Sequence, residues 1–183
     1  MNKLTKAGFA GLFLSLTAVL ASCGSSSETS SDTVAVTADV FPVTVGDLTL
    51  DAQPTRIISL SPTATEMLYA IGAGSQVVAV DEYSNYPAEA VALGTPLSGF
   101  EPNIEAISGY TPDLVIISYD PGSLVEQLST LDIPVFVAGA AMSIENVYEQ
   151  IEQLGVLTGN SQKAVEVSKS LQTGIEDAVA SVQ

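Results

Sequence analysis

The order of hydrophobic and polar positions divides the chain into three zones. Residues 7–20 form a nearly continuous apolar run, and residues 24–33 are mostly Ser, Thr, Glu and Asp. From residue 34 onward, short apolar runs alternate with polar ones, which is typical of elements with one buried face. We therefore expect a folded lobe over residues 34–159 and a further helix over residues 160–183.

Short apolar runs inside the lobe predict its strands. Four of them have the pattern of buried parallel strands: residues 56–60, 77–80, 114–117 and 134–138. Before them, β-rich runs at 40–45 and 48–50 flank Gly46 and Asp47, a pair that suits the two-residue turn of a hairpin. The expected fold class is α/β: a three-layer lobe with a mainly parallel sheet, helices on both faces and an N-terminal β-hairpin.

Apolar residues spaced three and four apart predict helices between the strands. The first helix starts at Ser61 and Pro62, an N-cap followed by proline, or at Thr63, which forms a capping box with Glu66. Both registers lead into the same apolar stripe, so the sequence leaves them open.

Further helices carry their own start signals. Ser123 and Glu126 form a second capping box, and Ser143 precedes a run with helical apolar spacing. The last helix begins near Asn160 and continues to Gln183 without a stop signal.

Composition and charge narrow the possible functions. Five Lys and Arg face 21 Asp and Glu, so the formal net charge is −16, and such a surface repels nucleic-acid phosphates. With no His and one Cys, the chain cannot form a Ser-His-Asp or Cys-His site, a zinc site or an internal disulfide. Neighbouring carboxylates such as Asp81 and Glu82 are expected to be solvated surface, with general acid-base catalysis as the alternative.

The first zone has the pattern of an export signal over residues 1–22. Lys3 and Lys6 precede an apolar run that is too short to span a bilayer comfortably. The junction at residues 20–24 resembles the lipobox of bacterial lipoproteins, which implies that Cys23 is lipidated and that residues 23–33 form a flexible tether. An ordinary signal peptide, or a membrane helix with an incidental Cys, is the alternative.

Aromatic residues follow the predicted strands, at the sheet edge where open α/β sheets bind ligands. They are Tyr83, Tyr86, Phe100 and Tyr119. Their rings suit a large, flat or apolar ligand, and packing within the loops is the alternative. Between residues 23 and 162 the single base is Arg56, so the lobe offers no cationic clamp for an anion.

Four segments in order resemble the N-terminal lobe of the cobalamin and iron-siderophore substrate-binding proteins of ABC importers. They are residues 56–66, 83–87, 102–107 and 112–116. The resemblance implies two α/β lobes joined by a long helix, with ligand held between the lobes. On that pattern residues 160–183 are the start of the interlobe helix and the second lobe is absent, either because the chain is a fragment or because it is a natural one-lobe form.

The resemblance also implies roles for single residues. Tyr83 and Phe100 correspond to aromatic ligand contacts, Ser118 takes a further ligand-facing position, and Tyr119 follows it by one residue. Glu105 corresponds to the exposed glutamate that docks onto the permease. No catalytic residue, metal site or cofactor is expected.

The expected function is that of a lipid-anchored solute-binding protein on the outer face of the cytoplasmic membrane, which is the periplasmic side in a diderm. It would capture a metal chelate, either a cobalamin-like corrinoid, an iron-siderophore or heme, and deliver it to an ABC permease. A one-lobe surface lipoprotein acting as an interaction module is the second hypothesis. A carboxylate-dependent hydrolase is the third.

Overall fold

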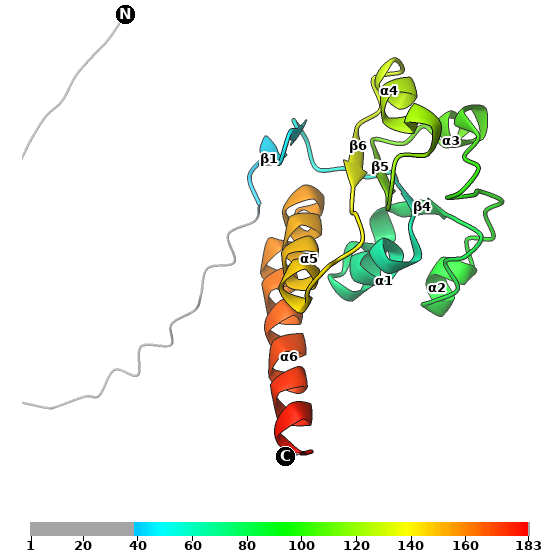
Figure 1. The fold of residues 1–183 in the computed structure, drawn as a ribbon. Helices are drawn as coiled ribbons and strands as arrows, with labels where there is room; N and C mark the ends of the chain where they lie inside the picture. The colour runs from blue at the N-terminus through cyan, green and yellow to red at the C-terminus, as the bar shows by residue number, and fades with distance from the viewer. Residues whose placement is uncertain (1–38, 183) are drawn as a thin grey trace, which may run out of the picture. The chain divides into compact units, whose positions relative to one another are not determined.

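The computed structural model describes residues 39–182 (Figure 1). The predicted signal peptide over residues 1–22, the lipidated Cys23 and the tether that ends at residue 33 lie outside the described residues. Within the described part, no helix combines the length and the apolar character needed to cross a bilayer.

The described chain opens with the predicted hairpin. Strands β1 (Val43–Val45) and β2 (Leu48–Leu50) pair antiparallel, with Val43 opposite Leu50. Gly46 in the turn has φ +57°, a left-handed conformation that glycine adopts without a steric penalty. The hairpin packs its apolar side on the lobe, where Leu50 is buried.

A second, four-stranded sheet carries the lobe. Its strands are β3 (Ile57–Leu60), β4 (Val77–Val80), β5 (Leu114–Ile117) and β6 (Val135–Val137). All neighbours are parallel, in the order β4-β3-β5-β6. Each predicted strand is confirmed to within one residue at either end, because parallel strands buried on both faces consist almost wholly of apolar residues.

Helices cover both faces of this sheet, which confirms the three-layer prediction. On one face α1 (Pro62–Ala70) and α5 (Ile144–Thr158) enclose a core that includes Ile57 and Ile116. On the other face, α3 (Ile104–Gly109) and α4 (Leu124–Ser129) enclose a core that includes Ile58 and Ile117. Successive side chains of one strand therefore pack into the cores on opposite faces of the sheet.

Short elements complete the connections. They are α2 (Ala88–Val91) and two 3-10 turns, Ala73–Gln76 and Pro121–Ser123. The sequence pattern predicted none of the three, because each is too short to show a helical period.

Two predicted helix starts are confirmed in detail and one is wrong. Ser61 Oγ accepts from the amide of Ala64, so the first of the two open registers is the real one, and Ser143 caps α5 in the same way. Ser123 caps nothing with its side chain, because it lies in the left-handed region at φ 61°. The amide of Val125 instead donates to Asp120 Oδ1 at 3.0 Å.

Helices α5 and α6 (Ser161–Ala180) lie side by side, and α6 extends beyond the start of α5 (Figure 1). They lie close together at Gly155, where an added Cβ would stand 2.4 Å from the Cβ of Ala164. Ala164 and Ser168 are the buried residues of α6, and every described residue after Ser168 is exposed.

Gly155→Ala is expected to destabilise the protein by about 1–3 kcal/mol, because the new methyl group overlaps the facing helix. Gly174→Ala in α6 is the matched control, since nothing lies within 4 Å of an added Cβ there. The control is expected to gain about 0.5–1 kcal/mol, the ordinary benefit of Ala over Gly inside a helix. Urea unfolding of both variants checks this, and equal stabilities would contradict it.

Candidate ligand-binding site

Three of the predicted aromatic residues meet in one cluster. The ring centroids of Tyr83 and Phe100 lie 5.4 Å apart with planes at 84°, an edge-to-face contact. Phe100 and Tyr119 follow at 6.2 Å and 45°. The rings come from the loop after β4, the loop before α3 and the loop after β5, yet these residues are 53%, 61% and 43% exposed in chain order, so a large part of their surface remains open.

A cavity of about 460 Å³ lies against this cluster. It is bordered by the ends of β3, β4 and β5 and by the residues that follow them: Leu60, Pro62, Asp81, Tyr83, Gly99, Phe100, Ser118 and Tyr119. The structure thus brings Tyr83, Phe100, Ser118 and Tyr119 together, all at the carboxyl edge of the sheet. We call this cavity the aromatic pocket.

The loop that carries Phe100 is held against the sheet edge by backbone contacts. The amide of Glu82 donates to the carbonyl of Leu97 at 2.9 Å, next to an isolated parallel bridge between Asp81 and Leu97. Gly99 then passes so close that an added Cβ would stand 2.7 Å from the carbonyl oxygen of Leu60 and 3.0 Å from Asp81 Oδ2. Glycine is therefore required there by space and not by φ.

A buried chain of hydroxyl groups lies beneath the pocket and ends at Asp81. Ser59 Oγ donates to the carbonyl of Ser61 at 3.1 Å, and Thr65 Oγ1 donates to Ser59 Oγ at 2.8 Å. Thr65 Oγ1 and Ser84 Oγ are 2.9 Å apart, and Ser84 Oγ lies 2.6 Å from Asp81 Oδ1. Asp81 itself is only 4% exposed.

The expectation that Asp81 is solvated surface is therefore wrong. Burial raises the pKa of the Asp81 carboxyl, and the neighbouring Glu82 carboxylate raises it further, while hydrogen bonds from Ser84 act in the opposite direction. No local pattern marks Asp81 as buried, because the contacts continue beyond Ser84 to Thr65 and Ser59 on other elements.

Tyr86 lies elsewhere. It is 64% exposed and borders a different cavity of about 640 Å³, together with Glu66, Tyr69 and Glu89. There the pKa of Tyr69 is raised by burial and then by the Glu89 carboxylate. The structure does not bring Tyr86 to the aromatic pocket.

A third cavity continues the aromatic pocket along the sheet edge. It measures about 380 Å³, shares Ser118 and Tyr119 with the aromatic pocket, and reaches Ala138 and Gly139 after β6. The open edge is therefore lined mostly by small and aromatic side chains.

None of the basic residues in the described part of the chain borders the aromatic pocket. Arg56 stands at the start of β3, at the opposite end of the strand, where its guanidinium donates to the carbonyls of Tyr110 and Thr111. Within residues 39–182 the one ion pair joins Lys163 and Glu166 on α6. The same residues contain no group of three or more His, Cys, Asp or Glu that could hold a metal ion.

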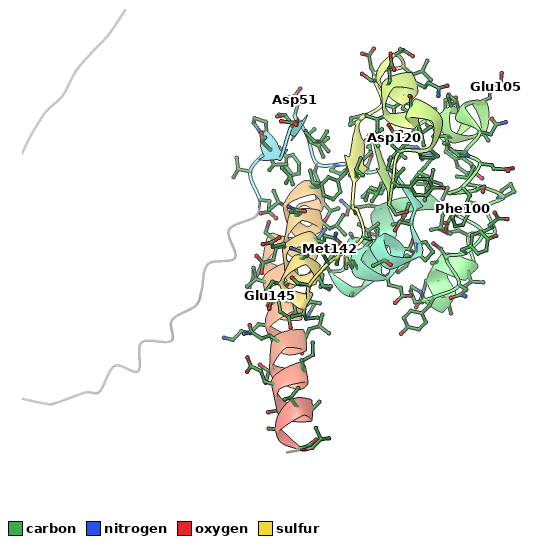
Figure 2. All side chains as sticks on the ribbon, in the orientation of Figure 1. Asp51, Phe100, Glu105, Asp120, Met142 and Glu145 are labelled. Carbon is green, nitrogen blue, oxygen red and sulfur yellow. The ribbon has the colours of Figure 1, made fainter. Side chains whose placement is uncertain are left out.

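Glu105 is exposed in the first turn of α3 (Figure 2). The helix starts where Asn103 Oδ1 accepts from the amide of Ala106 at 2.9 Å, an ordinary N-cap. A carboxylate at this position is favoured by the helix dipole.

Residues 57–183 match the family model described as "Periplasmic binding protein". The chain belongs to the periplasmic binding protein family. Its fold and the position of the aromatic pocket at the carboxyl edge of a parallel sheet agree with this membership.

The relatives of this periplasmic binding protein include proteins named for substrate binding and for cobalamin binding. An uncharacterized ABC transporter substrate-binding lipoprotein of Bacillus subtilis, YvrC, is 31% identical over 94% of this chain and 57% of its own length. A cobalamin-binding protein of Halobacterium salinarum is 34% identical over 76% of this chain and 41% of its own length. The chain therefore spans about half the length of these relatives.

Solved structures share the fold. A periplasmic vitamin B12 binding protein of Vibrio cholerae, BtuF, matches with a TM-score of 0.61 and 31% identity over 68% of this chain and 49% of its own. A possible iron-binding, periplasmic solute-binding protein of Staphylococcus epidermidis matches with a TM-score of 0.68 and 26% identity over 72% of this chain and 53% of its own.

Gly99→Ala is expected to destabilise this periplasmic binding protein by about 1–3 kcal/mol, because the methyl group meets the fixed carbonyl of Leu60. Gly139→Ala, at the neighbouring cavity, is the control, since an added Cβ there has nothing within 4 Å. Thermal unfolding compares the two variants. Equal melting temperatures for Gly99→Ala and Gly139→Ala would contradict the prediction and would show that the loop moves to accommodate the methyl group.

Proposed function

We propose that this chain is the solute-binding component of an ABC importer and that it captures a metal chelate, a cobalamin-like corrinoid, an iron-siderophore or heme. The observation that carries the proposal is the aromatic pocket, because three partly open rings gather at the edge of the sheet where α/β folds bind ligands. The names of relatives that bind cobalamin or vitamin B12 support this ligand class.

The chemistry of the pocket favours a corrinoid, or another chelate of low charge. Its lining consists of rings, small residues and one buried carboxyl group, with no Lys or Arg among the lining residues. An anionic chelate would require a cationic partner to offset its desolvation, whereas an aromatic wall stabilises a flat or apolar surface without one.

The ligand would be held between this lobe and a second one, with α6 as the connecting helix. Relatives are about twice as long as the chain, and α6 exposes a stripe of apolar side chains. They are Leu171, Ile175 and Val179, spaced four apart along the exposed half of the helix. A stripe of this kind needs an apolar partner in the folded protein.

We further propose that Cys23 carries lipid after removal of residues 1–22, so that the protein is held at the outer face of the cytoplasmic membrane. The lipobox-like junction in the sequence and the lipoprotein name of the Bacillus relative support this location. Residues 23–33 then act as the tether between membrane and lobe.

Phe100→Ala is expected to weaken the binding of cyanocobalamin about tenfold, since loss of a stacked ring costs roughly 1–1.5 kcal/mol. Tyr86→Ala is the matched control, because Tyr86 is as exposed as Phe100 but borders the other cavity. Its affinity is expected to stay within about twofold of wild type, well below the tenfold step that 1.4 kcal/mol produces. Isothermal titration calorimetry provides the measurement.

Equal losses in both variants would reject the aromatic pocket as the binding site. Absence of binding in wild type, for cyanocobalamin, heme and a ferric hydroxamate alike, would reject the solute-binding function of this chain. That outcome would favour an interaction module instead.

We propose that Glu105 docks onto a basic pocket of the permease. Glu105→Gln is expected to reduce substrate uptake by cells at least about tenfold while leaving ligand affinity unchanged, since truncating one partner of an interfacial charge pair costs about 2–5 kcal/mol. Glu145→Gln is the control, because Glu145 is also an exposed acid in the first turn of a helix and lies far from Glu105 in Figure 2. Equal uptake by the two variants would contradict the docking role.

A further inference from the structure

The hydroxyl chain beneath the aromatic pocket makes more hydrogen-bonding contacts than its hydroxyl groups have protons to donate. Four contacts run in series from the carbonyl of Ser61 through Ser59, Thr65 and Ser84 to Asp81, at 3.1, 2.8, 2.9 and 2.6 Å. Each contact at such a distance needs one proton between its two oxygens. The three hydroxyl groups supply three protons.

The missing proton must come from the Asp81 carboxyl group, at the end of the hydroxyl chain. If Asp81 is ionised, Ser84 donates to it and Ser59 donates to the carbonyl, so the single proton of Thr65 faces two acceptors. One contact then joins two oxygens without a proton. If Asp81 is protonated, it donates to Ser84, Ser84 donates to Thr65, Thr65 donates to Ser59, and all four contacts are made.

We propose that Asp81 is held protonated under conditions in which the other aspartates are ionised, and that it gives the aromatic pocket a neutral floor that accepts a hydrogen bond from an uncharged N–H group of the ligand. The ligand class rests on the proposed function, whereas the protonation state does not.

The surroundings of Asp81 favour the neutral form. The three residues of the hydroxyl chain are almost inaccessible to solvent: Ser59 is 0%, Thr65 0% and Ser84 5% exposed. A buried carboxylate is stable only where cations or hydrogen-bond donors compensate for its burial. Hydrogen bonds from Ser84 and from the backbone of Tyr83 lower the pKa of Asp81, but burial and the Glu82 carboxylate outweigh them and the pKa is raised. The titratable groups around Asp81 are the adjacent Glu82 carboxylate and the phenols of Tyr83 and Tyr119 across the pocket, and none of them is a cation.

The second oxygen of Asp81 is the one that a ligand would meet. Oδ1 belongs to the hydroxyl chain, whereas Oδ2 lies beside Gly99, 3.0 Å from the place a Cβ would take, and both Asp81 and Gly99 border the pocket. In a protonated carboxyl whose proton points along the chain, this oxygen is a carbonyl-type acceptor. A carboxamide N–H can donate to this neutral oxygen at a lower desolvation cost than to a carboxylate, because covering a charge with a ligand removes more of its hydration.

Carbon-13 NMR of the full chain labelled at aspartate Cγ tests the protonation state without ligand. The resonance of Asp81, assigned by its loss in Asp81→Asn, is expected to titrate at a higher pH than every other aspartate of the described chain. A midpoint at or below those of the other aspartates would overturn the proposal.

Thr65→Val tests whether the hydroxyl chain, and not burial alone, raises the titration midpoint of Asp81. This variant keeps the side-chain shape but removes two of the four contacts, so the two remaining hydroxyl protons serve the two remaining contacts and Asp81 no longer needs its own. The midpoint of Asp81 is expected to fall toward those of the other aspartates. An unchanged midpoint in a folded Thr65→Val would refute the proton count.

Stability gives a second readout. A group that binds its proton more tightly in the folded state loses stabilising effect as pH rises, so stability is expected to fall between the usual aspartate pKa of about 3.9 and the higher value of Asp81. Asp81→Asn is expected to remove that fall, and Asp47→Asn, at an exposed hairpin turn, is expected to keep it. The same pH profile in all three proteins would count against the proposal.

Cyanocobalamin, with carboxamide groups around its ring, tests the ligand class. Its affinity for wild type is expected to fall as pH passes the Asp81 midpoint, and Asp81→Leu is expected to bind about tenfold more weakly and without that pH dependence. A wild-type affinity that stays constant through the midpoint would overturn the neutral floor. No binding of cyanocobalamin at any pH would reject the corrinoid as the ligand, while the NMR titration still decides the protonation state.

Discussion

The parallel pairing of β3 with β4 on one side and β5 on the other is the constraint on which the rest of the structure depends. Because all three strands run in the same direction, their carboxyl ends meet at one edge, and the loops that follow them are brought together. The aromatic pocket exists only because Leu60, Asp81 and Ser118 follow or end neighbouring strands at that edge. The same pairing places Arg56 at the opposite end, away from the pocket.

The central position of β3 also explains the buried polar groups. Ser59 lies inside a strand that is buried on both faces, so its hydroxyl needs a partner within the protein. Thr65 on α1 and Ser84 after β4 provide the continuation, and the chain of contacts reaches the pocket floor at Asp81. A polar residue in the central strand is thereby connected with the chemistry of the ligand side.

Much of the architecture could be predicted from the sequence because it is encoded locally. Buried parallel strands are continuous apolar runs, and Ser61, Asn103 and Ser143 satisfy backbone amides only three residues away. The failure at Ser123 shows the limit of local reasoning, since the cap there comes from Asp120, which a 3-10 turn brings back toward the helix. The positions of Tyr83 and Tyr119 followed from strand ends, whereas Phe100 reaches them because the bridge between Asp81 and Leu97 holds its loop at the same edge.

What could not be predicted depends on contacts across long separations. Asp81 and Glu82 look alike in the sequence, and only the arrival of Thr65 and Ser84 makes one of them a buried group. Tyr83 and Tyr86 belong to one short segment, yet Ser84 between them is anchored inward by Asp81 and the chain then leaves the pocket.

Two sets of side chains form the aromatic pocket, one exposed and one buried. The rings of Tyr83, Phe100 and Tyr119 form a rim that is between 43% and 61% exposed, whereas the parts that shape the floor are buried in the sheet edge. Replacing a rim ring removes little of either core, so the surface of the pocket and the integrity of the fold are under separate control. Such a lobe can change the surface that it presents at the sheet edge over evolutionary time by substitutions at its rim, without first acquiring stabilising mutations elsewhere.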